Sequence, residues 1–275
     1  VRLYEVRPNT TAGTTVVVPI RSMETRRPTF HIDLEANTPK ELYLRLWSRT
    51  SMTSSLTLWR PEVLLPQVQK YNLISGLVLG AYLLVIAFYA LFSWWTRAKI
   101  HIYYTLYVCV NFMAAFFTGA WNHPLGWPMD PAVHTTFLGI SISLAMVFSA
   151  LFTIEFVQSK REWPKVSHTY IYFCTFAASI SIIAILNSHY REAQIYFQSL
   201  TILTIIFTTF ALFYLTFTGN KRARLLLIAL SIFHIGIAWR FMRNIGLIEP
   251  NAFNDNAYQI GAFVHMLIMS TGIFS

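Results

Sequence analysis

Charged side chains are scarce in this sequence. Of its 275 residues only 12% are Asp, Glu, Lys or Arg, and 55% are hydrophobic, whereas an average soluble domain is roughly 25% charged. A water-soluble fold of this length could not hide so much apolar surface. The composition therefore predicts an integral membrane protein.

Cysteine is also nearly absent. Cys109 and Cys174 are the two in the sequence, and both lie inside apolar stretches. This excludes a disulfide framework and a cysteine-based zinc site, and we predict neither a metal nor any other cofactor. The formal net charge is +9, but the basic residues fall between apolar runs rather than in one patch with exposed aromatics. We therefore expect no nucleic-acid partner.

Residues 1–69 have the pattern of short β-strands separated by turn-forming clusters. The strands that we predict are Thr15–Ile20, Thr29–Leu34, Glu41–Trp47 and Ser55–Trp59. Four short strands bury too little apolar area to form a stable domain alone. We therefore interpret them as part of a jelly-roll-like β-sandwich.

Long apolar runs fill residues 70–275, and each is near the ~20 residues needed to cross a ~30 Å hydrocarbon core. The predicted transmembrane helices are Tyr71–Trp95, His101–Trp121, Val133–Val157, His168–Leu186, Gln194–Phe217, Arg222–Ile245 and Asn256–Ser275. The expected fold is thus a mostly α membrane protein. Its seven-helix bundle, residues 70–275, follows a partial β-sandwich, residues 1–69, outside the membrane.

Basic residues in the loops predict the orientation, because Lys and Arg resist translocation. The loops after the first, third and fifth helices carry eight: Arg97, Lys99, Lys160, Arg161, Lys165, Lys221, Arg222 and Arg224. On the other side there are three: Arg191, Arg240 and Arg243. We therefore expect a periplasmic or extracellular N-terminal segment and a cytoplasmic C-terminus, with the lipid bilayer as the helices' partner.

Several short motifs stand in a characteristic order. The first helix carries Gly76-x-x-x-Gly80 and ends Phe88-Tyr89-Ala90-Leu91-Phe92, and the second opens Ile102-Tyr103-Tyr104-Thr105-Leu106-Tyr107. Gly119 and Pro128 follow, and the last helix runs from Tyr258-Gln259-Ile260-Gly261 to Ser270-x-Gly272. In this order they resemble the membrane domain of bacterial seven-transmembrane receptors with diverse intracellular signalling modules. The stretch from Arg27 to Arg45 is similar to the end of the sandwich domain that precedes it.

The resemblance implies a receptor in a bacterial inner membrane. It would sense an extracytoplasmic ligand, with glycan-like ligands expected, and control a cytosolic diguanylate cyclase, histidine kinase or phosphatase. No catalytic residue is expected in this segment itself. We expect the chain to continue before Val1 and beyond Ser275, where the last helix is still apolar.

Three side chains on one predicted strand face are candidate ligand contacts. Tyr43, Arg45 and Trp47 alternate with leucines, so their aromatic rings could stack on a sugar while Arg45 binds a hydroxyl or carboxylate. The alternative is that this face packs against a second sheet.

Ionisable groups at membrane depth are costly and suggest function. Four stand out here: Glu155, His234, Arg240 and His265. For Glu155 we expect an interfacial ion pair with Lys160 or Arg161, and for Arg240 a reach toward the outer interface. His234 and His265 lie at similar predicted depths, where they could share a hydrogen bond, bind a metal or switch with pH. In this family an acidic residue is more usual at the position of His265.

Gly76 and Gly80 allow close helix approach, either to a helix of the same chain or to a second copy in a homodimer. Among rival functions, a retinal protein is excluded because Asn256–Ser275 contains no Lys for a Schiff base. A transporter or channel is disfavoured by the lack of proline inside the predicted helices and of internal repeats. A non-signalling scaffold subunit stays open.

Overall fold

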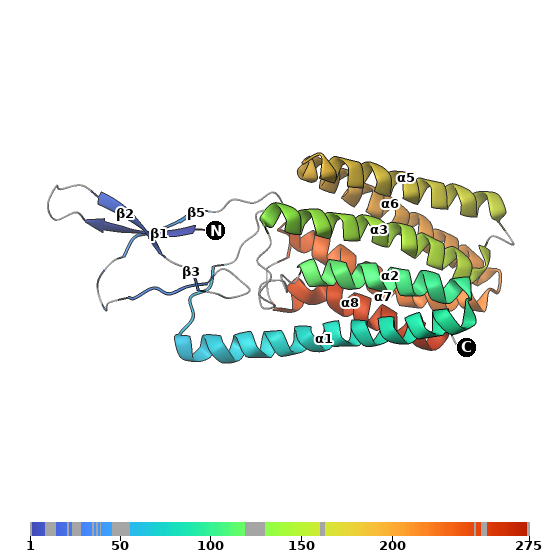
Figure 1. Ribbon diagram of the computed structural model, residues 1–275, viewed down its shortest axis with the longest axis horizontal. Helices are drawn as coiled ribbons and strands as arrows, with labels where there is room; N and C mark the ends of the chain where they lie inside the picture. Colours follow the sequence, from blue (N-terminus) through green and yellow to red (C-terminus); the bar gives the residue numbers. More distant parts are fainter. Residues whose placement is uncertain are drawn as a thin grey trace. The chain divides into compact units, whose positions relative to one another are not determined.

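The computed structural model (Figure 1) describes residues 2–8, 15–20, 22–23, 29–34, 36, 38, 40–45, 56–118, 130–159, 163–244, 246–248 and 252–273. By their contacts these residues form two units, one within 1–52 and one within 53–119 and 130–275. Each unit is described by itself.

The N-terminal unit contains two small antiparallel sheets. Its strands are β1 (Arg2–Pro8), β2 (Thr15–Ile20), β3 (Ser22–Met23), β4 (Thr29–Phe30) and β5 (Leu42–Arg45). The first sheet has the order β2-β1-β5, and β3 pairs with β4 in the second. In the pairing of β1 with β5, residue 4 lies opposite Tyr43 and residue 2 lies opposite Arg45.

The expected jelly-roll-like sandwich is not seen among the described residues, because β3 and β4 have two residues each and cannot cover a second layer. Other strand expectations for residues 1–69 fail as well. Residues 56–59 are not in a strand, and the strand predicted for Thr29–Leu34 ends at Phe30. The prediction also omitted β1, whose sequence RLYEVRP has no clean apolar alternation.

The C-terminal unit is helical, as predicted. Its helices are α1 (Pro61–Thr96), α2 (Lys99–Thr118), α3 (Pro131–Val157), α5 (Pro164–Leu186), α6 (Tyr190–Phe217), α7 (Lys221–Asn244) and α8 (Ala252–Gly272). Within the described residues, all of them except α8 are long and apolar enough to cross a membrane. Each predicted span therefore corresponds to one helix.

Helix boundaries are set by proline and capping residues that hydropathy alone does not weigh. Pro61, Pro131 and Pro164 each stand at a helix start, where proline's missing N–H costs nothing. α1 thus begins ten residues before the predicted span Tyr71–Trp95, and these added residues include Pro66. At ~1.5 Å per residue its 36 residues span about 54 Å, more than a ~30 Å hydrocarbon core.

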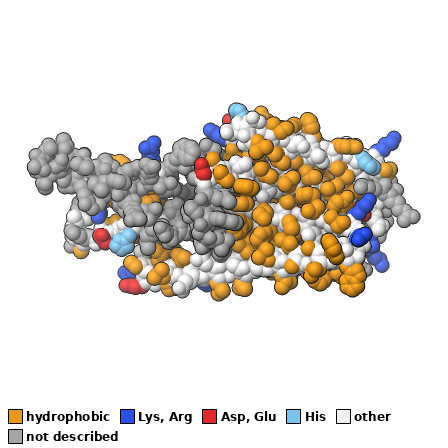
Figure 2. All heavy atoms as spheres, viewed as in Figure 1, with side chains coloured by type: hydrophobic (Ala, Val, Ile, Leu, Met, Phe, Trp, Pro, Cys, Tyr) orange, Lys and Arg blue, Asp and Glu red, His pale blue; other side chains and the backbone are white. Residues whose placement is uncertain are grey.

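Helices consecutive in the sequence pack side by side, and α1 also contacts α8, so the bundle closes on itself. α3 contacts α6 and α7 as well as α2 and α5, which places it inside the ring. The buried core consists largely of aromatic and small side chains from these helices. Hydrophobic side chains also cover the outside of the bundle (Figure 2), as expected of surfaces that face lipid.

One end of the bundle is strongly basic. Contacts between helix termini place the end of α1 and the starts of α2, α5 and α7 at the same end as the C-terminus of α8. The exposed cations of these termini are Arg97, Lys99, Lys165, Lys221, Arg222 and Arg224. In Figure 2, Lys and Arg gather at the right-hand end of the bundle, where Figure 1 shows the C-terminus.

Candidate functional site

Buried tyrosines from two helices meet a histidine from a third in the core of the bundle. Tyr82 of α1 and Tyr104 and Tyr107 of α2 are at most 4% exposed. His265 of α8, 2% exposed, lies against Tyr107 with ring centroids 5.6 Å apart in an edge-on geometry. Tyrosine hydroxyls and imidazole nitrogens at this depth need partners, so their hydrogen bonds decide what the cluster does.

Two tyrosine hydroxyls hold the last turns of α8. Tyr89 Oη of α1 donates to the main-chain carbonyl of Ser270 at 2.9 Å, and Tyr104 Oη of α2 donates to the carbonyl of Met266 at 3.0 Å. The two rings also contact each other edge to face, with centroids 4.6 Å apart. We call Tyr89 and Tyr104 the tyrosine latch.

A second polar contact joins α2 and α8 further toward the other end of the bundle. Tyr258 Oη donates to Oδ1 of Asn111 at 3.1 Å, and Asn111 Nδ2 donates to the carbonyl of Tyr107 at 2.8 Å. α8 is therefore tied to its neighbours by directional bonds at two levels about two turns apart.

His265 is the least satisfied polar group of the cluster. Its ring stacks on Phe233 of α7 with centroids 5.6 Å apart, and neither ring nitrogen makes a hydrogen bond of ordinary geometry to the residues that the structure describes. The main chain of Ala229 on α7 is a polar group that interacts with the imidazole of His265. Tyr82 Oη likewise has no hydrogen-bond partner in the described part of the chain. Buried polar atoms without partners cost about 1–3 kcal/mol each.

His234 does not hydrogen-bond to His265. Its Nδ1 lies 3.4 Å from Oγ1 of Thr209 on α6, whereas His265 packs between Tyr107 and Phe233. The two histidines are on adjacent helices, as expected, but their rings turn to different neighbours. Within the described residues no group of three or more His, Cys, Asp or Glu could hold a metal ion.

α7 and α8 approach each other closely through two glycines. A Cβ at Gly236 would lie 2.7 Å from the carbonyl oxygen of Ala257, and one at Gly261 would lie 3.0 Å from that of Ile232. Only glycine fits at such a backbone contact. Hydropathy had not distinguished these positions from other small residues.

The remaining intramembrane candidates are less central. Glu155 is half-buried near the end of α3, and its expected partners Lys160 and Arg161 lie outside the described residues. Arg240 is half-buried on α7. Gly76 and Gly80 are exposed, and nothing lies within 4 Å of a Cβ at Gly80. Among the described residues, no close approach to another helix of the same chain is therefore made at Gly80.

The predicted ligand face is partly described. Tyr43 and Arg45 are exposed on β5 and alternate with the half-buried Leu42 and Leu44. Tyr43, 54% exposed, has its hydroxyl 3.3 Å from Oε1 of Glu41. Trp47 lies outside the described residues.

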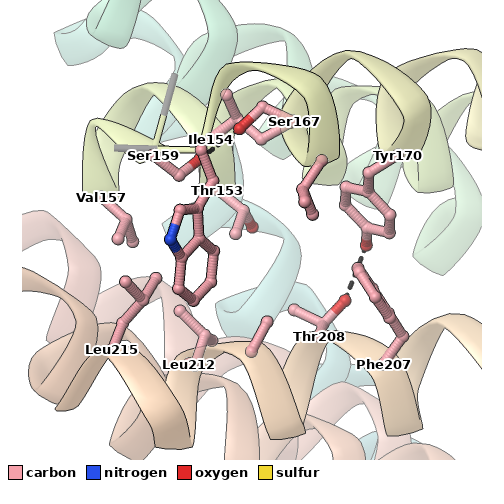
Figure 3. Close-up of a pocket in the computed structure, with 13 residues that line it drawn as sticks. Thr153, Ile154, Val157, Ser159, Ser167, Tyr170, Phe207, Thr208, Leu212 and Leu215 are labelled. Carbon is pink, nitrogen blue, oxygen red and sulfur yellow. Dashed lines mark hydrogen bonds between the residues drawn. The ribbon is translucent and has the colours of Figure 1, made fainter. Parts of the chain in front are cut away.

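A slot of about 50 Å³ opens between α3, α5 and α6 near the basic end (Figure 3). Most of its lining is apolar, with Val157, Leu212 and Leu215 at one side. Four of its hydroxyls are paired: Tyr170 with Thr208 at 2.7 Å, and Ser159 with Ser167 at 2.9 Å, both drawn as dashed lines in Figure 3.

The tyrosine latch was not among the predicted site residues, although the sequence held a signal for it. Tyr89, Tyr104, Tyr258, Gly261 and Ser270 all belong to the motifs that carry the family resemblance. The structure brings these separate motifs together at the contacts of α8 with α1, α2 and α7.

A family model described as 7TM diverse intracellular signalling matches residues 71–275. The chain belongs to this family. A search of curated proteins and a search of solved structures found no significant match. The family match covers all seven helices apart from the first ten residues of α1 and confirms the expected membrane domain.

Proposed function

We propose that this domain is the transmembrane part of a bacterial inner-membrane receptor. It carries a signal from an extracytoplasmic ligand to a cytosolic effector such as a diguanylate cyclase, histidine kinase or phosphatase. The family's description supports an intracellular signalling role. The observation that carries the proposal is the tyrosine latch, since it couples α1, the continuation of the N-terminal segment, to the terminal turns of α8.

The proposed mechanism is a shift between two arrangements of α8. Ligand can bias such an equilibrium only if it binds one arrangement more tightly. A movement of α1 or α2 would lengthen or break the hydroxyl–carbonyl contacts at Met266 and Ser270 and so release the end of α8. Helix–helix hydrogen bonds in membranes average about 0.6 kcal/mol, a cost small enough for a reversible switch.

We propose that the ligand is carbohydrate-like and contacts Tyr43 and Arg45. An exposed aromatic ring and a guanidinium on alternate positions of one strand suit stacking on a sugar and a bidentate hydrogen bond. A homodimer is also proposed, along the exposed face of α1 that carries Gly76 and Gly80.

The experiment compares variants in the full-length native chain, with effector output measured in cells given a panel of mono- and oligosaccharides. The double variant Tyr89→Phe/Tyr104→Phe should change basal output and blunt the response. Tyr172→Phe/Tyr196→Phe, at tyrosines that are 71% and 70% exposed on α5 and α6, is the matched control.

Tyr43→Ala/Arg45→Ala should abolish the response at normal folded yield, because both side chains are exposed. Effector output that is the same in the wild type and in the latch double variant would contradict the receptor proposal. Substrate flux in liposomes would favour a transporter instead.

A further inference from the structure

We infer that the slot between α3, α5 and α6 is a binding site for an anionic phospholipid, with a segment of an acyl chain in the slot and the headgroup among the cations at its mouth. The inference is independent of the proposed receptor function, since it concerns only the slot and the cations beside it.

The slot has the character that an alkyl chain requires. Four of its hydroxyls are already paired with each other, Tyr170 with Thr208 and Ser159 with Ser167, and most of the rest of its lining is apolar. It runs from Ser159, at the end of the bundle, to Phe207, about two turns deeper in α6 than Leu215. At ~1.5 Å per residue this is about 12 Å along the helix.

Cations stand beside the mouth of the slot. Lys165 is exposed in the first turn of α5, between the lining residues Trp163 and Val166. Asn220 Nδ2 donates to the carbonyl of Val157, another lining residue, at 3.3 Å. This bond fixes the start of α7, with exposed Lys221 next in sequence, at the same mouth.

Aromatic residues put these cations at headgroup level. Trp94 and Trp95, at the end of α1, are 86% and 83% exposed, and exposed tryptophans concentrate at the membrane–water interface. The one acidic residue described near this end is Glu155, which is half-buried. Basic residues just beyond the hydrocarbon attract anionic lipids, and here an apolar slot lies beside them.

The test uses the protein in nanodiscs of phosphatidylcholine that contain a lipid brominated in its acyl chain. The brominated lipid is either phosphatidylglycerol or phosphatidylcholine. Bromine quenches tryptophan at short range, and the difference between the wild type and Trp163→Phe isolates the signal of the slot. We expect brominated phosphatidylglycerol to quench this signal at a several-fold lower mole fraction than brominated phosphatidylcholine.

Lys165→Gln/Lys221→Gln should abolish that preference, because a single lysine near the headgroup contributes up to about fivefold, and high salt should weaken it. The control Arg60→Gln/Arg191→Gln removes two exposed charges at the opposite end and should leave it unchanged. Equal quenching by the two lipids would overturn the inference and assign the cations to another role, such as an acidic protein surface. A preference that survives loss of both lysines would overturn it too.

Discussion

Tyr104 of α2 donates its hydroxyl to the main-chain carbonyl of Met266 in α8 at 3.0 Å. Tyr82 of α1 is also buried, but its hydroxyl finds no hydrogen-bond partner among the described residues. The two residues sit in one core and differ in whether they bind α8. Comparing the two residues therefore distinguishes what a buried tyrosine ring contributes to stability from what its hydroxyl contributes.

Tyr104→Phe should destabilise the bundle and Tyr82→Phe should not. Each substitution removes one hydroxyl and leaves the ring in place, but only the first removes a hydrogen bond, worth about 0.6–1.7 kcal/mol between membrane helices. Thermal unfolding in detergent should therefore show a lower midpoint for Tyr104→Phe only. Equal midpoints for the two variants would mean that the bond to Met266 contributes nothing.

Gly236→Ala should separate α7 from α8. The added methyl group would lie 2.7 Å from the carbonyl oxygen of Ala257, a backbone atom that cannot move without the helix, and overpacking of this kind costs about 1–3 kcal/mol. Gly80→Ala is the control, because nothing lies within 4 Å of its Cβ. Thermal stability should fall for the first and hold for the second. A fall in thermal stability for Gly80→Ala but not for Gly236→Ala would contradict the close contact between α7 and α8.

The sequence predicted the seven helices well because long apolar runs are local features. The motifs that contain Tyr89, Tyr104 and Tyr258 were also recognised in the sequence. That these tyrosines make their contacts at α8 could not be predicted, because the contacts depend on how each helix is rotated about its axis. The N-terminal strands were harder. β1 lacks alternation, and the pairing of β5 with β1 rather than with the nearer β4 is a long-range choice that periodicity does not contain.

His265→Phe should leave stability unchanged or raise it by about 1 kcal/mol. The phenyl ring can keep the contacts with Tyr107 and Phe233 while it removes two nitrogens that make no hydrogen bond of ordinary geometry to the described residues, and removing unsatisfied polar atoms is neutral to favourable. His265→Asp, by contrast, should destabilise strongly because it buries a bare carboxyl group. If Phe proved as damaging as Asp, the imidazole would have a partner, such as an ordered water, that the ring contacts do not reveal.

Labelling of single cysteines should place the basic end of the bundle in the cytoplasm. Arg191 at the start of α6 and Lys221 at the start of α7 are both exposed and lie at opposite ends of the bundle, because α6 runs the length between them. In a background with Cys109→Ser and Cys174→Ala, a membrane-impermeant maleimide should label Arg191→Cys in intact cells. Lys221→Cys should react only after permeabilisation. The expectation rests on the six exposed cations at the same end of the bundle as Lys221, because Lys and Arg resist translocation across the membrane. Since α8 ends at the same end, the result also decides on which side an effector joined to α8 would lie. Labelling in the reverse pattern would put that effector outside the cell, and the receptor proposal would fail with the orientation.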